Sequence, residues 1–244
     1  MAEEAALAPE TVSEAFEQVV RGRRSVRKFL EEPVPEPVIE KCLELAVLAP
    51  NSSNLQPWEF HWVRTPQMKA VIAEACMGQS AATTASDLIV VVARTGTWRA
   101  HAKRMIADWP GGNPPKIVRD YYGRLAPFMY TQGILSVIGH GKRVLTMAVG
   151  LFRAMPREPV SLGDMKVWAT KSTALACENI MLAARAYGYD TCPMEGFDSA
   201  RVKRALKLPG DALIPMIISV GKAAPDGIYG PQFRFSTNEF VKRY

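Results

Sequence analysis

The run Leu88-Ile89-Val90-Val91-Val92 constrains the fold of this chain more than any other segment. Consecutive apolar residues, most of them β-branched, are typical of a strand that is covered on both faces. The segments around it alternate between helical and extended patterns without a strict βαβ repeat. The sequence therefore favours an α+β sandwich over a doubly wound sheet, and its 244 residues are enough for one domain of this kind.

Hydrophobic periodicity locates the remaining elements. Bulky residues alternate in 58–63, and short apolar runs recur late in the chain, so we expect strands there as well. The longest amphipathic pattern covers 164–186 and is ended by Gly188. We predict strands over 58–63, 88–92, 189–192 and 213–220, and helices over 11–20, 38–49, 67–77, 98–109, 164–186 and 199–206, with further helical stretches within 116–159.

Four cationic side chains crowd into Arg23-Arg24-Ser25-Val26-Arg27-Lys28. Guanidiniums this close together repel one another unless an anion lies among them, and their planar forks match the oxygens of a phosphate. That phosphate could be inorganic, part of a nucleic acid or part of a cofactor. A solvated basic turn is the alternative, because charge runs usually mark exposed faces.

Composition narrows the possible partners. The net charge of +6 suits anionic ligands but is modest for a nucleic-acid binder of this size. The four cysteines share no CxxC spacing and the three histidines have no ligand-like neighbours. We therefore expect no structural zinc site, and cysteines that are buried in a reducing compartment.

The amino-terminal segment carries no targeting signal that we recognise. Residues 1–10 contain glutamates and no continuous apolar core, unlike a secretory signal peptide. No run in the chain approaches the roughly 18 apolar residues of a membrane span. These patterns predict a cytoplasmic protein.

Two polar segments could contact a ligand. The loop at 49–58 concentrates hydroxyls and carboxamides, which could bind a heteroaromatic ring edge or a polyol chain; an ordinary turn that caps its neighbours is the alternative. In 193–198, which we place between a strand and a helix, Gly196 would let a backbone N–H approach a flat ligand. Asp198 would cap the following helix, as in any strand-to-helix turn.

Together and in this order, these segments resemble the nitroreductase family of FMN-dependent flavoproteins. The resemblance rests on the basic segment 23–29, on the polar loop 49–60 and on Pro193-Met194-Glu195-Gly196-Phe197-Asp198, with a further fit over 230–241. It implies a three-layer α/β/α sandwich with a mainly antiparallel sheet, forming a single domain over 1–244. It also implies a helical excursion at about 98–159, a C-terminal arm at 223–244, and a homodimer with FMN sites at the interface.

The resemblance implies roles for individual residues at the phosphate end. Arg23, Arg24 and Ser25, helped by Arg234, would hold the ribityl phosphate. Arg27 would stabilise negative charge on the pyrimidine side of the reduced ring. Two positions depart from the family pattern, because Gln232 stands where a second cation is often found and Lys171-Ser172 where an aspartate is often found.

The resemblance also implies three segments around the flavin ring. The polar loop would reach the ring from the other subunit, the strand-to-helix segment would lie over one ring face with a backbone N–H directed at N5, and a carboxamide would lie at the polar edge. The residues concerned are Pro50, Asn51, Ser52, Asn54, Gln79, Pro193, Met194, Glu195 and Gly196.

The implied activity is hydride transfer from NADH or NADPH through the flavin to an electron-poor acceptor such as a nitroaromatic or a quinone, with ping-pong kinetics. The cofactor would carry the chemistry, so no side chain is assigned as a catalytic acid or base. A helical cover over 98–159 could form the substrate wall, with Tyr121, Tyr122, Phe128 and Tyr130 as wall residues or plain core. A non-catalytic FMN-storage protein, a dehalogenating or flavin-consuming variant, and a nucleic-acid binder are the alternatives.

Overall fold

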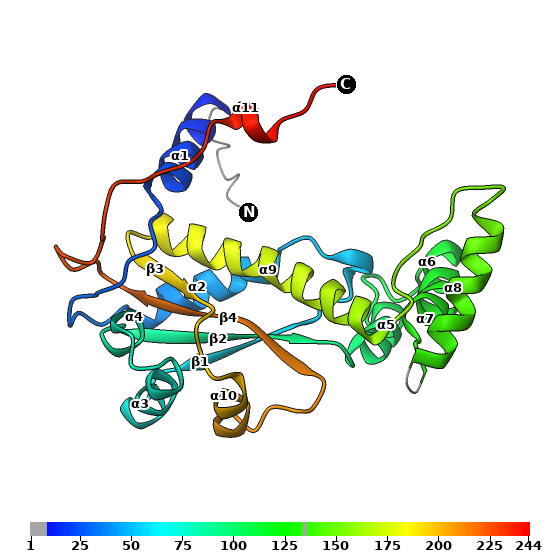
Figure 1. Ribbon diagram of the computed structural model, residues 1–244, viewed down its shortest axis with the longest axis horizontal. Helices are drawn as coiled ribbons and strands as arrows, with labels where there is room; N and C mark the ends of the chain where they lie inside the picture. The colour runs from blue at the N-terminus through cyan, green and yellow to red at the C-terminus, as the bar shows by residue number, and fades with distance from the viewer. Residues whose placement is uncertain (1–8, 134–135) are drawn as a thin grey trace.

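A four-stranded antiparallel sheet lies at the centre of the computed structural model, which describes residues 9–133 and 136–244 (Figure 1). Its strands are β1 (Trp58–Val63), β2 (Asp87–Arg94), β3 (Asp190–Met194) and β4 (Ala212–Gly221), in the order β1-β2-β4-β3. Every neighbouring pair is antiparallel. The predicted strands are all present.

Strand β2 is buried on both faces, as its unbroken apolar run predicts. Leu88, Val90 and Val92 pack into the core on one side of the sheet. Ile89 and Val91, which point the opposite way, pack into the core on the other side. The alternation within one strand therefore requires a layer of helices on each face.

Those layers come from helices that are distant in sequence (Figure 1). Helices α2 (Glu36–Ala46) and α9 (Leu162–Ala186) cover one face. Helices α3 (Pro66–Ala75) and α10 (Ser199–Ala205), with the short α4 (Ser80–Thr83), cover the other. This arrangement confirms the predicted α+β sandwich with helices on both sides of an antiparallel sheet.

The helical excursion lies beyond one end of the sheet (Figure 1). It comprises α5 (Trp98–Ala107), α6 (Lys116–Asp120), a π-helical turn η2 (Tyr121–Leu125), α7 (Ala126–Tyr130) and α8 (Val137–Val149). A third apolar cluster joins it to the first half of α9.

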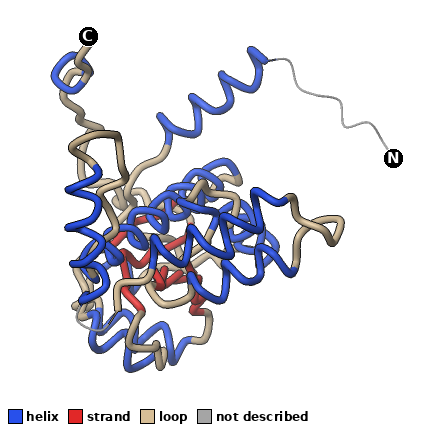
Figure 2. Tube along the Cα trace, turned by 90° about the vertical axis from the view of Figure 1, so that its right-hand side faces the viewer, coloured by secondary structure: helices blue, strands red, loops and turns tan. Residues whose placement is uncertain are grey.

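The two ends of the described chain project away from this body (Figure 2). Helix α1 (Pro9–Gly22) precedes the basic segment, and the tail carries the short α11 (Thr237–Phe240). Residues 228–244 are all exposed, although they include Tyr229, Phe233, Phe235 and Phe240. A monomer rarely leaves so many aromatic side chains in water, so this tail is suited to lie on another surface.

Most sequence-based boundaries agree with the structure to within a few residues. One expectation is wrong: Pro193 and Met194 belong to β3 and are not part of the turn, because their backbone pairs with Ile218 and Ile217 of β4. Helices α4 and α11 were not predicted, since four-residue helices leave almost no periodic signal. The interpretation of 1–10 falls largely on residues outside the described part.

Across the described residues, no helix combines the length and the apolarity that crossing a membrane requires. All four cysteines are free and buried. Burial raises the pKa of Cys42 and Cys76 to about 11 and that of Cys177 to about 12. These thiols are therefore protonated and unreactive at neutral pH.

Candidate functional site

The basic segment and the C-terminal tail together form one cavity of about 230 Å³. Arg23, Arg24, Ser25 and Arg27 line it from one side, and residues 228–234, including Arg234, line it from the other. About 200 residues of sequence separate the two segments. The structure thus brings together the four residues expected at a phosphate, and Arg27 and Gln232 line the same cavity.

Backbone pairing places the basic segment beside β3. Ser25 forms a parallel bridge with Thr191, and the Val26 N–H donates to the Thr191 carbonyl at 3.0 Å. On its other side, the Arg27 N–H donates to the carbonyl of Gly227 at 2.7 Å. The completely buried Val26 side chain anchors the segment, so the arginines on either side of it are held at the surface of the core.

The guanidiniums of this cavity carry no compensating negative charge. None of Arg23, Arg24, Arg27 and Arg234 forms an ion pair with any residue of 9–133 or 136–244. Arg24 donates to the carbonyl of Gly230 at 2.6 Å, and Arg234 donates to its neighbour's carbonyl. Most of their N–H groups therefore remain free for a ligand.

This donor set fits a phosphate monoester. Such a group carries about −1.5 to −2 charges and three strong acceptor oxygens, so it would neutralise the repulsion among the guanidiniums. The Arg27 guanidinium carbon lies 5.7 Å from the centre of the Tyr229 ring, and both residues line the cavity. The residues present are therefore suited to the phosphate end of FMN.

The charges of two of these arginines also act on Cys192, which lies in β3. Burial raises the pKa of this thiol, and the charges of Arg27 and Arg23 partly offset the effect. The two guanidiniums therefore lie within electrostatic reach of the strand that leads into the 193–198 segment.

Gln79 and the 193–198 segment meet at the end of β3. The Gln79 side-chain N–H₂ donates to the Gly196 carbonyl at 3.0 Å and to the Cys76 carbonyl at 3.1 Å. The Gly196 N–H itself forms no hydrogen bond with any residue that the structure describes. Gly196 and its neighbour Glu195 are exposed, so a flat ligand can approach this backbone.

Asp198 caps α10 as the sequence predicts. Its carboxylate accepts the N–H groups of Ala200 and Arg201 at 3.0 and 3.1 Å. Its own N–H donates to the carbonyl of Ala75 at 2.8 Å, which ties the segment to α3. The exposed backbone at 195–196 is thus held at both ends.

The polar loop lies at the opposite end of the sheet from the arginine cavity. The cavity adjoins Thr191, which pairs with Val220 near the end of β4. The loop leads into Trp58, whose partner Ala93 pairs with Leu213 near the start of β4. Within one chain, the structure therefore does not bring Pro50, Asn51, Ser52 and Asn54 to the cavity.

The loop is held in an unusual backbone conformation. Ser53, Asn54 and Gln56 have positive φ angles of 61, 47 and 45°, in the left-handed region that costs energy for residues with a Cβ. The Asn51 side chain supports this shape by accepting the Gln56 N–H at 2.7 Å. A strained loop of this kind persists only where its surroundings fix it.

Three phenols from the helical excursion fix the loop at Ser53. The Tyr121 and Tyr130 hydroxyls lie 2.6 and 2.9 Å from the Ser53 hydroxyl, and Tyr122 donates to the Ser53 carbonyl at 3.0 Å. The Tyr130 hydroxyl also lies 3.1 Å from that of Ser52. We call Tyr121, Tyr122 and Tyr130 the tyrosine clasp.

Of the four aromatic residues that we proposed as wall or core residues, the three of the clasp contact the loop. Tyr130 is buried against Trp98 and Trp168, so it belongs to the core and reaches the loop with its hydroxyl alone. Phe128 is about half exposed and lies near Lys142 instead, outside the clasp. Sequence reasoning missed Ser53, whose positive φ has no signature in the residue type.

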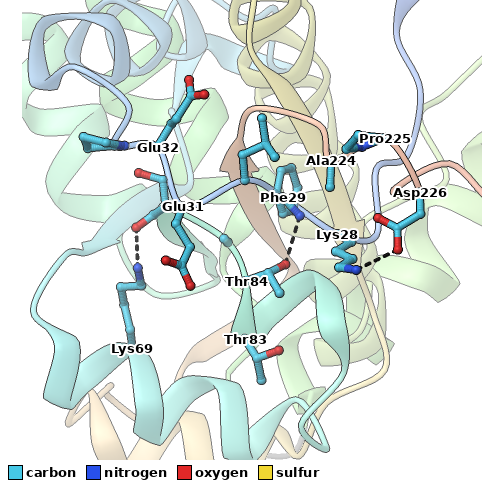
Figure 3. A pocket seen from close by; sticks show the side chains of 14 residues that line it. Lys28, Phe29, Glu31, Glu32, Lys69, Thr83, Thr84, Ala224, Pro225 and Asp226 are labelled. Carbon is cyan, nitrogen blue, oxygen red and sulfur yellow. Dashed lines mark hydrogen bonds and ion pairs between the residues drawn. The ribbon is translucent and has the colours of Figure 1, made fainter.

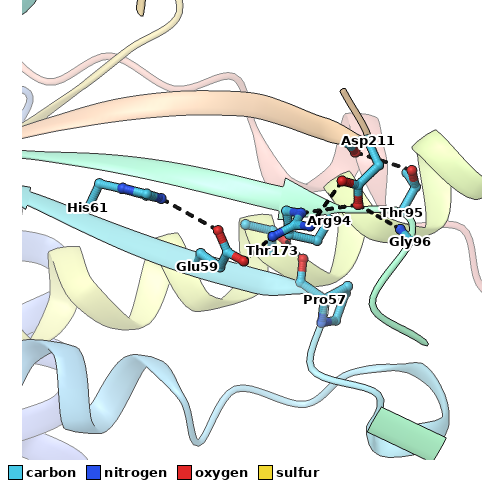
Figure 4. Close-up of polar contacts among 8 residues, drawn as sticks. All are labelled: Pro57, Glu59, His61, Arg94, Thr95, Gly96, Thr173 and Asp211. Carbon is cyan, nitrogen blue, oxygen red and sulfur yellow. Dashed lines mark hydrogen bonds and ion pairs between the residues drawn. The ribbon is translucent and has the colours of Figure 1, made fainter. Parts of the chain in front are cut away.

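An ionic network fixes the sheet next to the loop (Figure 4). Arg94 holds Asp211 through two hydrogen bonds of 3.0 and 2.9 Å and also binds Glu59. The Arg94 N–H donates to the Pro57 carbonyl at 2.8 Å, directly after the loop. Burial tends to raise the pKa of Asp211, but the hydrogen bonds from Arg94 and from the Gly96 N–H together lower it below its usual value.

Another cavity, of about 700 Å³, contains none of the predicted site residues (Figure 3). It lies beside Phe29 and α4, and its cations already have partners. Lys28 pairs with Asp226 at 2.6 Å, and Lys69 donates to the Ser86 carbonyl at 2.5 Å. The unpaired guanidiniums therefore favour the smaller arginine cavity as the anion site.

Comparison with known proteins agrees with this geometry. The Nitroreductase family matches residues 20–222. An NADH dehydrogenase from Thermus thermophilus is 31% identical over 206 residues, covering 84% of this chain and 85% of that protein. Protein DrgA from Synechocystis is 34% identical over 208 residues, covering 84% and 82%.

Solved structures share the fold. A Bacillus subtilis protein, the nitroreductase YdfN, superimposes with a TM-score of 0.73 at 24% identity, covering 96% of this chain and 100% of that one. An Exiguobacterium sibiricum protein described as a nitroreductase in complex with FMN gives 0.68 at 26% identity, covering 94% and 97%.

Proposed function

Because this chain belongs to the nitroreductase family and is an enzyme of that family, we propose that it is an FMN-dependent oxidoreductase. It passes hydride from NADH or NADPH to an electron-poor acceptor, such as a nitroaromatic or a quinone. The observation that carries this proposal is the cavity in which Arg23, Arg24, Ser25 and Arg234 meet without a compensating carboxylate. The FMN in the Exiguobacterium structure and the NADH named for the Thermus relative support it.

The arginine cavity would hold the phosphate of FMN. Each charge-assisted hydrogen bond contributes on the order of 1.5–3 kcal/mol, so two or three of them give useful affinity after the loss of ligand freedom. Arg23 and Arg24 are half-buried, so they lose less side-chain entropy when a phosphate binds than exposed arginines would. Arg27 would stabilise negative charge on the adjoining ring.

The isoalloxazine ring would lie along the exposed backbone at 195–196. The unpaired Gly196 N–H can donate to a ring nitrogen, and Gln79 holds that backbone in place through the Gly196 carbonyl. When bound, FMN supplies a ring that accepts hydride at N5 and returns it to a second substrate. The protein positions the reactants and supplies charge, and no side chain is needed as an acid or base.

A homodimer would complete each site. One chain carries the arginine cavity and the polar loop at opposite ends of its sheet, so two chains related by a twofold axis can each supply the half that the other lacks. The exposed aromatic tail at 228–244 has the composition of an interface segment. The tyrosine clasp would then hold the loop in the shape that contacts the partner's cofactor.

The first experiment is an absorption spectrum of the purified protein, followed by steady-state assays. We expect flavin bands in the blue and near ultraviolet, and oxidation of NADH or NADPH with p-benzoquinone and nitrobenzene as acceptors. A protein that binds FMN but turns over no acceptor with either donor would be the storage protein instead. A colourless protein that FMN cannot reconstitute would contradict the proposal.

A further inference from the structure

Helix α8 lies at the outer edge of the excursion and carries its apolar residues on the outside (Figure 1). The side that it buries consists of Gly139, Lys142 and Thr146. Residues three and four apart on a helix share a face, and the face opposite the buried one is apolar and exposed. We call this face, together with the turn after the helix, the apolar stripe; it consists of Val137, Ile138, Val144, Leu145, Leu151 and Phe152.

Contacts on the buried side fix this orientation. The Lys142 ammonium donates to the carbonyls of Phe128 and Met129 at 3.1 and 2.7 Å. A Cβ at Gly139 would collide with the Val160 carbonyl, so only a glycine lets the helix pack this closely. Turning the apolar stripe inward would break these hydrogen bonds and bring larger side chains to the close contact. The stripe therefore stays exposed in a single chain.

The excursion that carries α8 also holds the surplus positive charge of the chain. Residues 98–159 contain ten arginines and lysines and three acidic residues, whereas the remaining residues contain 20 and 21. Arg143, Arg153 and Arg157 are exposed and form no ion pair with any residue that the structure describes. Glu158 lies near two of them and offsets part of their charge. The surroundings of α8 remain positive.

These cations border the apolar stripe. Arg143 directly precedes Val144, and Arg153 directly follows Phe152. Arg157 lines the same hollow of about 420 Å³ as Arg143. An exposed apolar helix face with arginines beside it is typical of a helix that lies on a membrane, where the apolar side chains enter the acyl boundary and the cations stay among the headgroups.

A second copy of the chain is the alternative occupant. The apolar segment that it could offer is the exposed tail at 228–244, but this tail contains three cations and one glutamate. Two copies of α8 placed face to face would also bring like charges together. Repulsion disfavours both contacts, whereas an anionic surface complements the charge beside the stripe.

We propose that the apolar stripe of α8 and the arginines beside it bind the surface of an anionic lipid bilayer. Leu151 and Phe152, which are 80% and 90% exposed, enter the boundary between headgroups and acyl chains. Arg143 and Arg153 pair with the lipid phosphates. One helix face makes this contact, so it needs no membrane-spanning helix. The inference goes beyond the proposed function and does not depend on the cofactor.

The test measures the partitioning of the whole chain onto phospholipid vesicles by cosedimentation. We expect binding to vesicles of phosphatidylcholine and phosphatidylglycerol in equal amounts, and little binding to phosphatidylcholine alone. Each arginine near an anionic surface raises partitioning roughly fivefold, so Arg143→Gln should lower it by about that factor. Arg201→Gln, which removes an exposed arginine of α10 that pairs with Glu74, should leave partitioning unchanged.

The apolar contribution is tested at Phe152. We expect Phe152→Ser to lower partitioning about tenfold, because the ring no longer leaves water when the protein binds. The side chain is already exposed, so the urea midpoint of this variant should equal that of the wild type. Phe240→Ser is the matched control, since it removes an exposed ring of the tail.

A protein that does not bind the anionic vesicles overturns the inference. Binding that Phe152→Ser retains and Phe240→Ser loses also overturns it, because the tail would then be the membrane contact. Light scattering distinguishes the alternative occupant: if no vesicle is bound and Phe152→Ser has a smaller particle mass than the wild type, the apolar stripe contacts a second copy.

Discussion

At the scale of single residues, the arrangement of charge partners distinguishes binding groups from structural ones. Lys28 and Arg94 each have a carboxylate within hydrogen-bonding distance. Arg23, Arg24 and Arg234 have none among the described residues, although they line the same cavity. Sequence reasoning could find the cluster of Arg23–Lys28, but it could not tell which of its cations is already paired.

Removal of one guanidinium from the cavity should weaken the binding of FMN and not that of riboflavin, which lacks the phosphate. For Arg24→Gln we expect the Kd for FMN to rise about 10- to 100-fold, because one charge-assisted interaction of about 1.5–3 kcal/mol is lost. Fluorescence titration of the apoprotein with both ligands measures the effect. Arg21→Gln, whose parent side chain pairs with Glu17 on α1, is the matched control.

An equal loss of affinity for FMN and riboflavin in Arg24→Gln would show that the arginine supports the fold or the ring, and not the phosphate. The comparison of ligands guards against this, since the structural role of the Arg24–Gly230 hydrogen bond is the same with either ligand.

Because of Asp211, the free energy of unfolding should depend on pH in the acidic range. Its folded pKa is lowered, so the stabilisation that it gives is present above its unfolded pKa of about 3.9 and is lost as pH falls through the folded pKa. The difference in free energy of unfolding between the wild type and Asp211→Asn should therefore be largest near neutral pH and shrink below about pH 4.

Urea denaturation across this pH range measures that difference. Asp108→Asn, which removes an exposed carboxylate at the end of α5, controls for the change in net charge. A difference for Asp211→Asn that stays constant down to pH 2 would contradict the role of the Arg94 network.

At the scale of elements, the sequence patterns predicted those helices and strands whose formation depends on residues close together in the chain. The apolar run of β2 and the long period of α9 predicted both the type and the approximate extent of these elements. The extension of β3 to Met194 could not be predicted, because the pairing with β4 that causes it is made 23 residues later in the chain. The tyrosine clasp could not be predicted either, since it joins Ser53 to residues that lie 68 to 77 positions later in the chain.

Helix α9 should depend measurably on its amino-terminal cap. Ser161 accepts the Asp164 N–H, and the Asp164 carboxylate accepts the Ser161 N–H in return. We expect Ser161→Ala to lower the free energy of unfolding by about 1 kcal/mol. Chemical denaturation gives the value, and a change in midpoint without a change in slope would show that the cooperative unit is intact.

The same substitution at Ser236 provides the control, because that serine caps only the four-residue α11 in the exposed tail. We expect Ser236→Ala to leave the midpoint unchanged. Equal losses at the two positions would mean that the tail unfolds with the body, against the exposure of residues 228–244.

At the scale of the whole molecule, one chain carries the arginine cavity and the polar loop at opposite ends of its sheet. The order β1-β2-β4-β3 keeps the arginine cavity next to β3 and sends the polar loop to the start of β1. The sequence predicted both groups of residues and their separation between subunits only through the family resemblance. No periodicity or propensity encodes which surfaces of two chains meet.

The central claim is that each cofactor site takes its phosphate half from one chain and its loop half from another. Mixing two defective variants tests it most directly. One variant carries Arg23→Gln and Arg24→Gln, the other carries Ser52→Ala and Asn54→Ala, and each alone should bind FMN poorly. In a mixed dimer, one site combines both defects and the other is fully wild type.

The measurement is the FMN bound per chain after the two variants are unfolded and refolded together in equal amounts. Random pairing makes about half of the dimers mixed, so we predict that the mixture binds about one FMN for every four chains with wild-type affinity. A mixture that binds no more FMN than the separate variants would contradict a site shared between two chains.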